Sequence, residues 1–405
     1  MKKFEIPSYF RSSIISRVKE IRKLQDPRKK DFSPSRLRFD KVEFLIARHF
    51  GFCYGVENAI EIAYKALDEN PTKKIYLLSQ MIHNPGVNED LLRKGVKFIQ
   101  DTEGVQLISW DEITNEDIVI IPAFGTTIET EALLAGIGVN IHAYNTTCPF
   151  VEKVWNRSEK LASDNHTIII HGKYDHEETR ATFSHSSVST HSLIIKNKEE
   201  AHYLSDYLLG KYSDESFLSY FRDKYTQNFH PSLHLKKIGV VNQTTMLASE
   251  TEEITELLRN TMIKVYGVDD IKNHIADTKD TLCYATNDNQ SSTYGLMEAD
   301  ADLAIVIGGY NSSNTIHLVE LLDVKFTTFF IKSEESIISK ESIVHFNIHT
   351  SKEETVLQFL PSKRPLKIII TSGASCPDSI VDAVIQKILK ITDTKDSIEI
   401  ALDRM

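Results

Sequence analysis

The sequence predicts an α/β protein made of three similar modules with mainly parallel sheets. The first observation is a recurring pattern: a short β-branched or aliphatic run, a polar or small-residue loop, then an amphipathic helical stretch. Strands that alternate with helices of this length are typical of βαβ units. The second observation is the length of 405 residues, which at about 150 residues per domain corresponds to two or three domains.

The predicted elements follow one another from residue 43 onward. Three strand–helix units join Phe44–Ala47 to Val56–Leu67, Ile75–Leu78 to Val87–Arg93, and Ile118–Ile121 to Glu129–Leu134. Further strands are predicted at Ile168–Ile170, Ile238–Val241, Leu303–Ile307 and Ile368–Ile370. Residues 196–237 interrupt this pattern with an aromatic, polar stretch that indicates a helical insertion with a small aromatic core. We therefore expect modules at residues 42–147, 148–280 (with the insertion) and 281–405, and residues 42–53 are able to pack with the third.

Residues 1–41 differ from the rest of the chain in charge. They carry 13 Lys or Arg against 5 Asp or Glu, an excess of +8, so a whole-chain net charge of −10 leaves −18 for the remainder. A short helix is predicted near Ile14–Leu24. The simpler interpretation is a solvated basic extension. The alternative is a docking arm for an acidic partner.

Composition and motifs exclude several classes of protein. The net charge of −10 disfavours nucleic acid as a partner. The four cysteines lie far apart without a CxxC pair, which argues against a disulfide scaffold or a zinc ribbon. Apolar runs are of strand length, and no apolar segment follows the first three residues, so we expect no membrane span and a cytoplasmic protein. The sequence has no phosphate-binding GxxxxGK[ST] and no well-placed GxGxxG motif, which disfavours an ATPase or a dinucleotide dehydrogenase.

Three cysteines share one local setting, between a strand and a helix. Cys53 follows the first predicted strand, Cys148 lies between Thr147, a plausible N-cap, and Pro149, and Cys283 precedes a helix predicted at Gln290–Glu298. A helix N-terminus stabilises thiolate, the form that ligates metals. Three thiolates that meet at one centre suit an iron–sulfur cluster with one open iron, or a Cys₃ zinc site. The alternative is three inert buried cysteines.

Loops rich in hydroxyls and amides follow other strands. Hydroxyls and backbone N–H groups at helix N-termini form anion sites, and several of them at one point would suit a diphosphate. Each loop alone is weak evidence, because Ser, Thr and Asn are also common helix caps. The loops are Gly125-Thr126-Thr127, Gln243-Thr244-Thr245, Asn311-Ser312-Ser313-Asn314 and Ser372-Gly373-Ala374-Ser375.

Two histidines and a carboxyl complete the candidates. His83 lies at a strand end, and His176 lies in the segment His176-Glu177-Glu178. A histidine near a phosphate binds it as a cation or transfers a proton. A carboxyl beside an anionic ligand keeps its proton to neutral pH and acts as a general acid. The alternative for each is a surface or capping residue.

Taken together, these segments resemble the 4-hydroxy-3-methylbut-2-enyl diphosphate reductase (LytB) family over roughly residues 43–390. The ordered set is specific, although no single member is. The matching segments are Gly51-Phe52-Cys53-Tyr54-Gly55-Val56, Ile82-His83-Asn84, Thr146-Thr147-Cys148-Pro149, His176-Glu177-Glu178, Gln243-Thr244-Thr245, Cys283-Tyr284-Ala285-Thr286, Asn311-Ser312-Ser313-Asn314, Gly373-Ala374-Ser375 and Pro377-Asp378.

The resemblance implies a cloverleaf of three α/β modules around a central [4Fe-4S] cluster with one open iron. It implies that Cys53, Cys148 and Cys283 hold the cluster, and that Glu178 delivers a proton with Thr244 assisting. It also implies a two-electron reductive removal of a hydroxyl from (E)-4-hydroxy-3-methylbut-2-enyl diphosphate. The products are isopentenyl and dimethylallyl diphosphates, at the last step of the non-mevalonate isoprenoid pathway, with electrons from ferredoxin or flavodoxin. The substrate-binding residues implied by the family are His83, His176, Thr244, Asn311, Ser312, Ser313, Asn314 and Ser375.

The sequence departs from the family at two positions. Phe124 occupies the place of a usual family histidine, and we expect Thr126, Thr127 or Lys173 to compensate. Cys376 stands where a small apolar residue is usual, and an inert thiol is the preferred interpretation over a fourth ligand. Two other functions remain open: a Cys₃ zinc hydrolase of a phosphorylated metabolite with Glu178 or His176 as base, and a non-catalytic iron–sulfur redox sensor.

Overall fold

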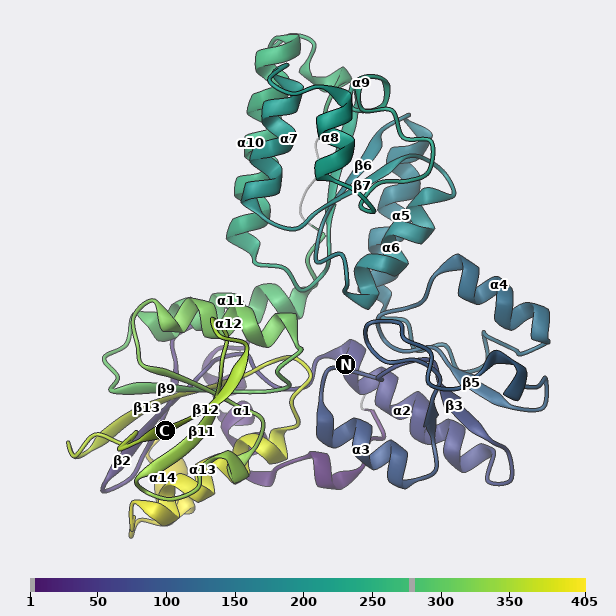
Figure 1. Cartoon of the computed structure of the whole chain (residues 1–405). Helices are drawn as coiled ribbons and strands as arrows, with labels where there is room; N and C mark the ends of the chain where they lie inside the picture. Colours follow the sequence, from purple (N-terminus) through teal and green to yellow (C-terminus); the bar gives the residue numbers. More distant parts are fainter. Residues whose placement is uncertain (1–3, 277–280) are drawn as a thin grey trace. The chain divides into compact units, whose positions relative to one another are not determined.

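A computed structural model describes residues 4–276 and 281–405, and the fold is α/β throughout. Lys2, Lys3 and the predicted module boundary at residue 280 lie outside the described residues. The chain divides into two compact units, drawn in Figure 1. The first unit comprises Met1–Glu57, Ile82–Glu89 and Tyr284–Met405, and the second comprises Asn58–Met81 and Asp90–Cys283.

The first unit is built on a five-stranded sheet in the order β1-β2-β13-β9-β10. Four strands run parallel and β1 pairs antiparallel to β2 at the edge. Central strands such as β2 and β9 are buried at every residue, which is why they are continuous apolar runs instead of alternating ones. The strands are β1 (Ser35–Arg38), β2 (Val42–Ile46), β9 (Leu303–Ile307), β10 (Thr328–Ile331) and β13 (Leu366–Ser372), with a separate hairpin of β11 (Ser342–Asn347) and β12 (Lys352–Leu357).

Helices on this sheet complete a single apolar core. Figure 1 shows α11 and α12 together along one face, whereas α1 packs against both α13 and α14 below the sheet. Their bounds are α1 (Ser13–Gln25), α11 (Tyr284–Met297), α12 (Ser313–Asp323), α13 (Asp378–Ile391) and α14 (Ile398–Asp403), with short 3₁₀ turns at η1 (Ser8–Phe10) and η4 (Glu334–Ser336).

The N-terminal segment is part of this unit, so the prediction of a solvated extension at residues 1–41 is wrong for the residues described. Ile15 and Val18 of α1 are buried in the core, and β1 supplies the sheet edge. The basic charge is partly neutralised, because Lys19 Nζ lies 2.8 Å from Asp378 Oδ1 on α13. The apolar face of α1 and this ion pair explain why the segment docks despite its charge.

The second unit contains two three-stranded parallel sheets. One has the order β4-β3-β5 and the other β7-β6-β8. The elements of the first are β3 (Ile75–Leu77), β4 (Lys97–Phe98), β5 (Ile118–Ile120), α2 (Tyr54–Glu69), α3 (Pro85–Arg93), η2 (Trp110–Glu112) and α4 (Ile128–Ile137); the first residues of α2 and α3 belong to the first unit. Those of the second are β6 (Thr167–His171), β7 (Ser192–Ile195), β8 (Ile238–Asn242), α5 (Pro149–Ser163), α6 (Glu177–Ser187), α7 (Lys198–Leu208), α8 (Asp214–Tyr220), α9 (Pro231–His234), α10 (Ala248–Tyr266) and η3 (Ile271–Asn273).

The stretch 196–237 folds into α7, α8 and α9 beside the sheet of β6, β7 and β8. Tyr207, Phe217, Phe221 and Phe229 from this stretch are buried and pack together with core residues of the sheet. These aromatic side chains are therefore structural. Among the residues that the structure describes, no helix combines the length and apolar character that a bilayer span requires.

Candidate functional site

Polar side chains of the first unit gather where β9 and β13 end. Asn311 Nδ2 donates to His83 Nδ1 at 3.1 Å, and Ser375 Oγ donates to the His83 carbonyl at 3.1 Å. His83 and Ser375 are buried, and Asn311 is exposed. Because the carboxyl ends of parallel strands meet at one edge of a sheet, loops more than 200 residues apart in the sequence come together here.

The start of α12 supplies a further donor to this cluster. Ser312 caps the helix by accepting from Thr315 N at 3.4 Å, so its hydroxyl is engaged in the fold. Asn314 Oδ1 accepts from Ala374 N at 3.0 Å, which ties the loops after β9 and β13 together. The Asn314 Nδ2 group is buried without a hydrogen-bond partner among the described residues. An unused amide donor at a helix N-terminus is what a bound anion requires.

A glycine allows the two loops to approach so closely. A Cβ at Gly309 would lie 2.4 Å from the His83 carbonyl oxygen, and a backbone atom cannot give way cheaply. Only glycine therefore fits at this position of the loop.

Cys53 lies beside this cluster, between β2 and α2. Its N–H donates to the Ala374 carbonyl at 3.2 Å, and the next residue, Tyr54, donates its N–H to the Tyr284 hydroxyl at 2.9 Å. The turn before it uses Gly51 at φ +79°, a backbone conformation that favours glycine. Cys53 is half-buried and belongs to no disulfide.

In the second unit, a buried glutamate lies against the loop after β8. Glu178, 1% exposed, accepts hydrogen bonds from the Thr244 N–H and, at 2.9 Å, from the Thr244 hydroxyl. Burial raises the pKa of Glu178 to about 7, although both hydrogen bonds from Thr244 act to lower it. The carboxyl therefore holds a proton near neutral pH, as a general acid requires. His176 is the N-cap of α6, and its Nδ1 accepts from Glu178 N at 3.2 Å, so the remaining ring proton of the neutral form sits on Nε2.

Cys148 and Cys283 lie near this carboxyl. Cys283 N–H donates to the Thr244 carbonyl at 3.2 Å, and Cys148 is itself the N-cap of α5, with Pro149 as the first helical residue. The prediction of Thr147 as the cap is thus wrong, because the Thr147 hydroxyl donates to Asn145 Oδ1 instead. The helix that was predicted from Gln290 begins at Tyr284, directly after Cys283.

The predicted effect of the helix N-terminus on Cys148 is present, but burial outweighs it. Burial, together with the nearby Cys283 and Glu178, raises the pKa of the Cys148 thiol to about 11, although two backbone N–H groups act to lower it. A thiol in this setting becomes a thiolate only beside a strong positive charge such as a metal ion. Cys148 and Cys283 form no disulfide and both lie near Glu178, a setting that suits metal ligands.

The loop after β5 was predicted to contribute to an anion site, but its two threonines make contacts within the fold. Thr127 caps α4 by accepting from Thr130 N at 3.3 Å, so this hydroxyl serves the helix. Thr126 is buried and its carbonyl faces His185 Nε2 at 3.1 Å. Phe124 makes an edge-on contact with the His176 ring, with centroids 5.6 Å apart. Phe124 therefore orients a site histidine through ring packing.

Glu177 and Gln243 lie inside the matching segments, but no role in this site was predicted for either of them from the sequence. Glu177 is 7% exposed and accepts a hydrogen bond from Ser79 at the end of β3. Gln243 Oε1 accepts from Lys173 N and from Thr179 Oγ1, both at 3.1 Å. The only signal for Glu177 is its position at the first turn of a helix, which also fits an exposed acidic residue.

Cys376 is fully buried in the core of the first unit. Burial raises the pKa of this thiol to about 12, and Sγ lies 3.6 Å from the Pro377 carbonyl. Within each unit, no three described His, Cys, Asp or Glu side chains gather closely enough to hold a metal ion. The free thiols are divided between the units, with Cys53 in the first and the pair Cys148 and Cys283 in the second.

Comparisons with known proteins agree with one another. Residues 44–389 match the model of the family described as LytB protein. The chain is 42% identical over 356 residues to a 4-hydroxy-3-methylbut-2-enyl diphosphate reductase of Prochlorococcus marinus subsp. pastoris, covering 87% of this chain and 86% of the relative. It is 37% identical over 390 residues to the protein of that name in Cyanothece sp., covering 96% and 91%.

Two solved structures share the fold. One is titled as (E)-4-hydroxy-3-methyl-but-2-enyl diphosphate reductase, the terminal enzyme of the non-mevalonate pathway; its TM-score is 0.52 at 23% identity, over 87% of this chain and 100% of that one. The other is the E-1-hydroxy-2-methyl-but-2-enyl-4-diphosphate reductase from Plasmodium falciparum, with a TM-score of 0.62 at 20% identity, over 87% and 89%. The predicted α/β fold and the predicted resemblance are both confirmed. The family match spans most of the chain and the relatives exceed 30% identity, so this chain belongs to the LytB protein family.

Proposed function

We propose that this protein is an oxidoreductase that converts (E)-4-hydroxy-3-methylbut-2-enyl diphosphate to isopentenyl and dimethylallyl diphosphates. The observation that carries the proposal is the buried Glu178, which pairs with Thr244 while the Thr244 carbonyl accepts from Cys283. A carboxyl that keeps its proton near neutral pH is thereby fixed to the loop that leads into a proposed metal ligand. The reaction consumes two electrons and two protons and releases the hydroxyl as water.

The proposed ligands of a [4Fe-4S] cluster are Cys53, Cys148 and Cys283. Each is a half-buried cysteine outside any disulfide and directly before a helix, and three thiolates leave one iron of such a cluster open. When bound, the cluster supplies a Lewis-acidic iron and relays single electrons. Cys376 is not proposed as a ligand, because its buried thiol is enclosed in the core of the sheet.

The substrate diphosphate is proposed to bind the polar cluster of the first unit. Supporting observations are the unused Asn314 amide donor, the start of α12 and the buried His83 and Ser375. Hydrogen-bond donors at a helix N-terminus bind phosphate oxygens and so orient the rest of the substrate. Further proposed contacts are Asn311, Ser312, Ser313, His176 and Thr244. Glu178 is proposed to protonate the departing hydroxyl, because hydroxide is otherwise a poor leaving group.

Electrons are proposed to come one at a time from a ferredoxin or flavodoxin. The proposed compartment is the cytoplasm, where reducing conditions keep thiols free for metal binding.

The test is anaerobic purification followed by iron, sulfide and turnover assays on the same sample. We expect a brown protein with about four irons per chain that forms both products from the hydroxylated diphosphate. Glu178→Gln should keep its iron and lose most of its kcat, whereas Cys148→Ser should lose both iron and activity. Cys376→Ser is the matched control and should keep both. A protein that stays colourless after reconstitution with iron and sulfide would refute the proposal, and zinc in that sample would favour a hydrolase. A full cluster without turnover would favour a redox sensor.

A further inference from the structure

The turn between α1 and β1 displays three consecutive cations. Arg28, Lys29 and Lys30 are exposed, and their side chains form no ion pair with any described carboxylate. The two acids that flank them are already engaged. Asp26 Oδ2 lies 3.4 Å from Arg48 Nε, and Asp31 Oδ2 lies 3.0 Å from Arg22 Nη2. The positive charge of Arg28, Lys29 and Lys30, which we name the basic turn, is therefore uncompensated.

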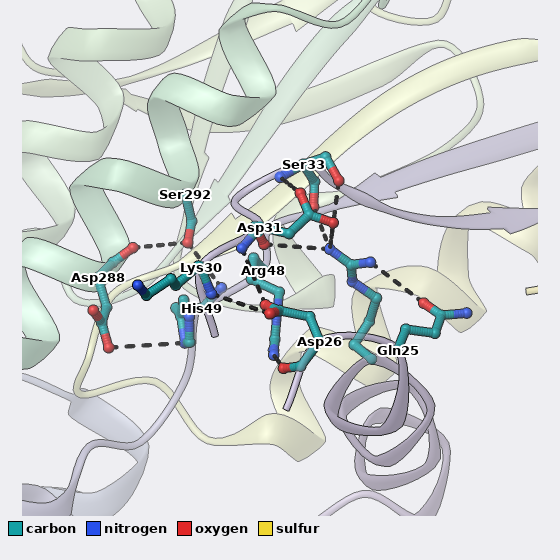
Figure 2. Close-up of polar contacts among 10 residues, drawn as sticks. Gln25, Asp26, Lys30, Asp31, Ser33, Arg48, His49, Asp288 and Ser292 are labelled. Atoms are coloured by element: carbon teal, nitrogen blue, oxygen red, sulfur yellow. Dashed lines mark hydrogen bonds and ion pairs between the residues drawn. The ribbon is translucent and has the colours of Figure 1, made fainter. Parts of the chain in front are cut away.

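Hydrogen bonds from the turn to Asp26 fix its backbone, and Figure 2 shows those of Lys30 and Arg48. The Asp26 carbonyl accepts from Lys29 N at 3.1 Å, and the Asp26 carboxylate accepts from Lys30 N and Asp31 N, both at 3.1 Å. Arg48 is buried and donates from Nη2 to the Asp26 carbonyl at 3.2 Å. A pre-ordered charged turn loses little conformational entropy when a partner binds.

The basic turn also lies beside the segments that adjoin two of the proposed ligands. Asp26, at the start of the turn, pairs with Arg48, which directly precedes His49 in the sequence. His49 N–H donates to Ser292 Oγ on α11 at 3.0 Å, and His49 Nδ1 lies 4.0 Å from Asp288 on the same helix (Figure 2). His49 precedes Cys53 by four residues, and α11 begins directly after Cys283.

The basic turn is opposite in charge to most of the chain. Residues 1–41 carry +8 in a chain whose net charge is −10, so the remainder carries −18 and repels an acidic protein. An exposed, uncompensated positive turn on an otherwise acidic protein steers an acidic partner to one place. Charge–charge steering of this kind is typical of brief encounters between electron-transfer proteins, whose interfaces are small.

We propose that the basic turn is the docking site for an acidic one-electron carrier protein of the ferredoxin type. Each encounter oxidises one carrier by one electron and passes that electron to this protein, so two encounters supply the two electrons of one turnover. This inference rests on the proposed function, since it names where its electron donor binds.

The test compares Arg28→Glu/Lys29→Glu/Lys30→Glu with a control triple variant, in which the exposed Lys73, Lys74 and Lys97 of the second unit become Glu. Both variants change the net charge from −10 to −16, so they differ only in where the charge is reversed. The probe is a plant-type ferredoxin, with binding measured by calorimetry and turnover measured against ferredoxin concentration. A neutral version with Gln at the same three positions should fall between wild type and the Glu variant.

We expect the basic-turn variant to lose at least ~10-fold in ferredoxin affinity and kcat/KM at low salt, as reversal of steering charges does. Its turnover with a small chemical reductant, its KM for the diphosphate and its iron content should match those of wild type. Equal loss in both variants, or no loss in the basic-turn variant, would overturn the proposal. Absence of turnover with the chemical reductant in wild type would instead refute the proposed function, while the calorimetric comparison would still decide the docking site.

Discussion

Glu177→Gln isolates the effect of one buried carboxyl on stability. Glu177 accepts a hydrogen bond from Ser79. Burial raises the pKa of Glu177 to about 7, and the charge of Asp101 adds to this increase. The hydrogen bond from Ser79 and the charge of Arg180 act to lower the pKa. A carboxyl with a pKa near 7 in the folded state and an ordinary value of 4.5 binds more protons when folded at intermediate pH. Its stabilising effect is therefore complete below pH ~4.5 and is lost as the pH rises through about 7.

The magnitude follows from the difference between these two pKa values. At 1.36 kcal/mol per pKa unit, a pKa of about 7 against 4.5 corresponds to about 3 kcal/mol in the free energy of unfolding. Glutamine is neutral at every pH and its amide oxygen still accepts from Ser79. We therefore expect the variant to match wild type near pH 4, to exceed it by about 1 kcal/mol at pH 5 and to exceed it by about 3 kcal/mol at pH 8.

Urea unfolding followed by tryptophan fluorescence measures this difference in unfolding free energy in the second compact unit of the chain. The two tryptophans, Trp110 and Trp155, both lie in the second unit together with Glu177. Glu159→Gln, at an exposed position on α5, is the control and should leave the pH dependence unchanged. Parallel curves of unfolding free energy against pH for wild type and Glu177→Gln would show that the buried carboxyl does not titrate in the way inferred.

Three further variants test packing, acidity and ring orientation. Gly295→Ala places a Cβ 2.1 Å from a backbone carbonyl of the N-terminal segment, so urea unfolding should show a loss of about 1–3 kcal/mol in the free energy of unfolding. Gly136→Ala on α4 is the control. Its Cβ would meet nothing within 4 Å, so the free energy of unfolding should rise by up to about 1 kcal/mol. Thr244→Val removes one of the two hydrogen bonds that lower the pKa of Glu178, so the descending limb of the kcat–pH profile should move to higher pH; an unmoved limb contradicts the assignment of Glu178 as the acid. Phe124→Leu removes the edge-on contact with the site histidine, worth about 0.5–1.5 kcal/mol, so the KM for the diphosphate should rise roughly 2- to 10-fold with little change in kcat.

The α/β fold could be predicted because strand runs and helix patterns are local properties of the chain. Loops at the carboxyl ends of parallel strands meet by topology, so the gathering of His83, Asn311 and Ser375 followed from their positions after predicted strands. The docking of α1 could not be predicted, because the charge of residues 1–41 hides an apolar face whose partner, α13, lies more than 350 residues away. Local sequence contains no information about such a partner.

The ionisation of the Cys148 thiol was equally out of reach, whereas a carboxyl that keeps its proton to neutral pH was expected from the sequence. A helix N-terminus lowers the pKa of a thiol, and this local effect was the one visible at Cys148. Burial depends on the whole unit, and it dominates at Cys148 and Glu178. The contact between Glu177 and Ser79 joins residues 98 apart in the sequence, so a glutamate at the start of α6 could only be assigned as an exposed acid.

The two proposed binding sites of the first unit differ in the kind of charge they present, and ionic strength separates them. The cluster around His83, Asn314 and Ser375 consists of buried amides, hydroxyls and helix N–H groups, whereas the basic turn consists of exposed cations. Exposed charges are screened within about 8–10 Å at 0.1–0.15 M salt, and buried hydrogen bonds are screened far less. Raising the salt concentration should therefore weaken the kcat/KM for ferredoxin steeply while the KM for the diphosphate changes little. A steep rise in the diphosphate KM with salt would mean that exposed cations bind the substrate, and it would count against the assignment of both sites.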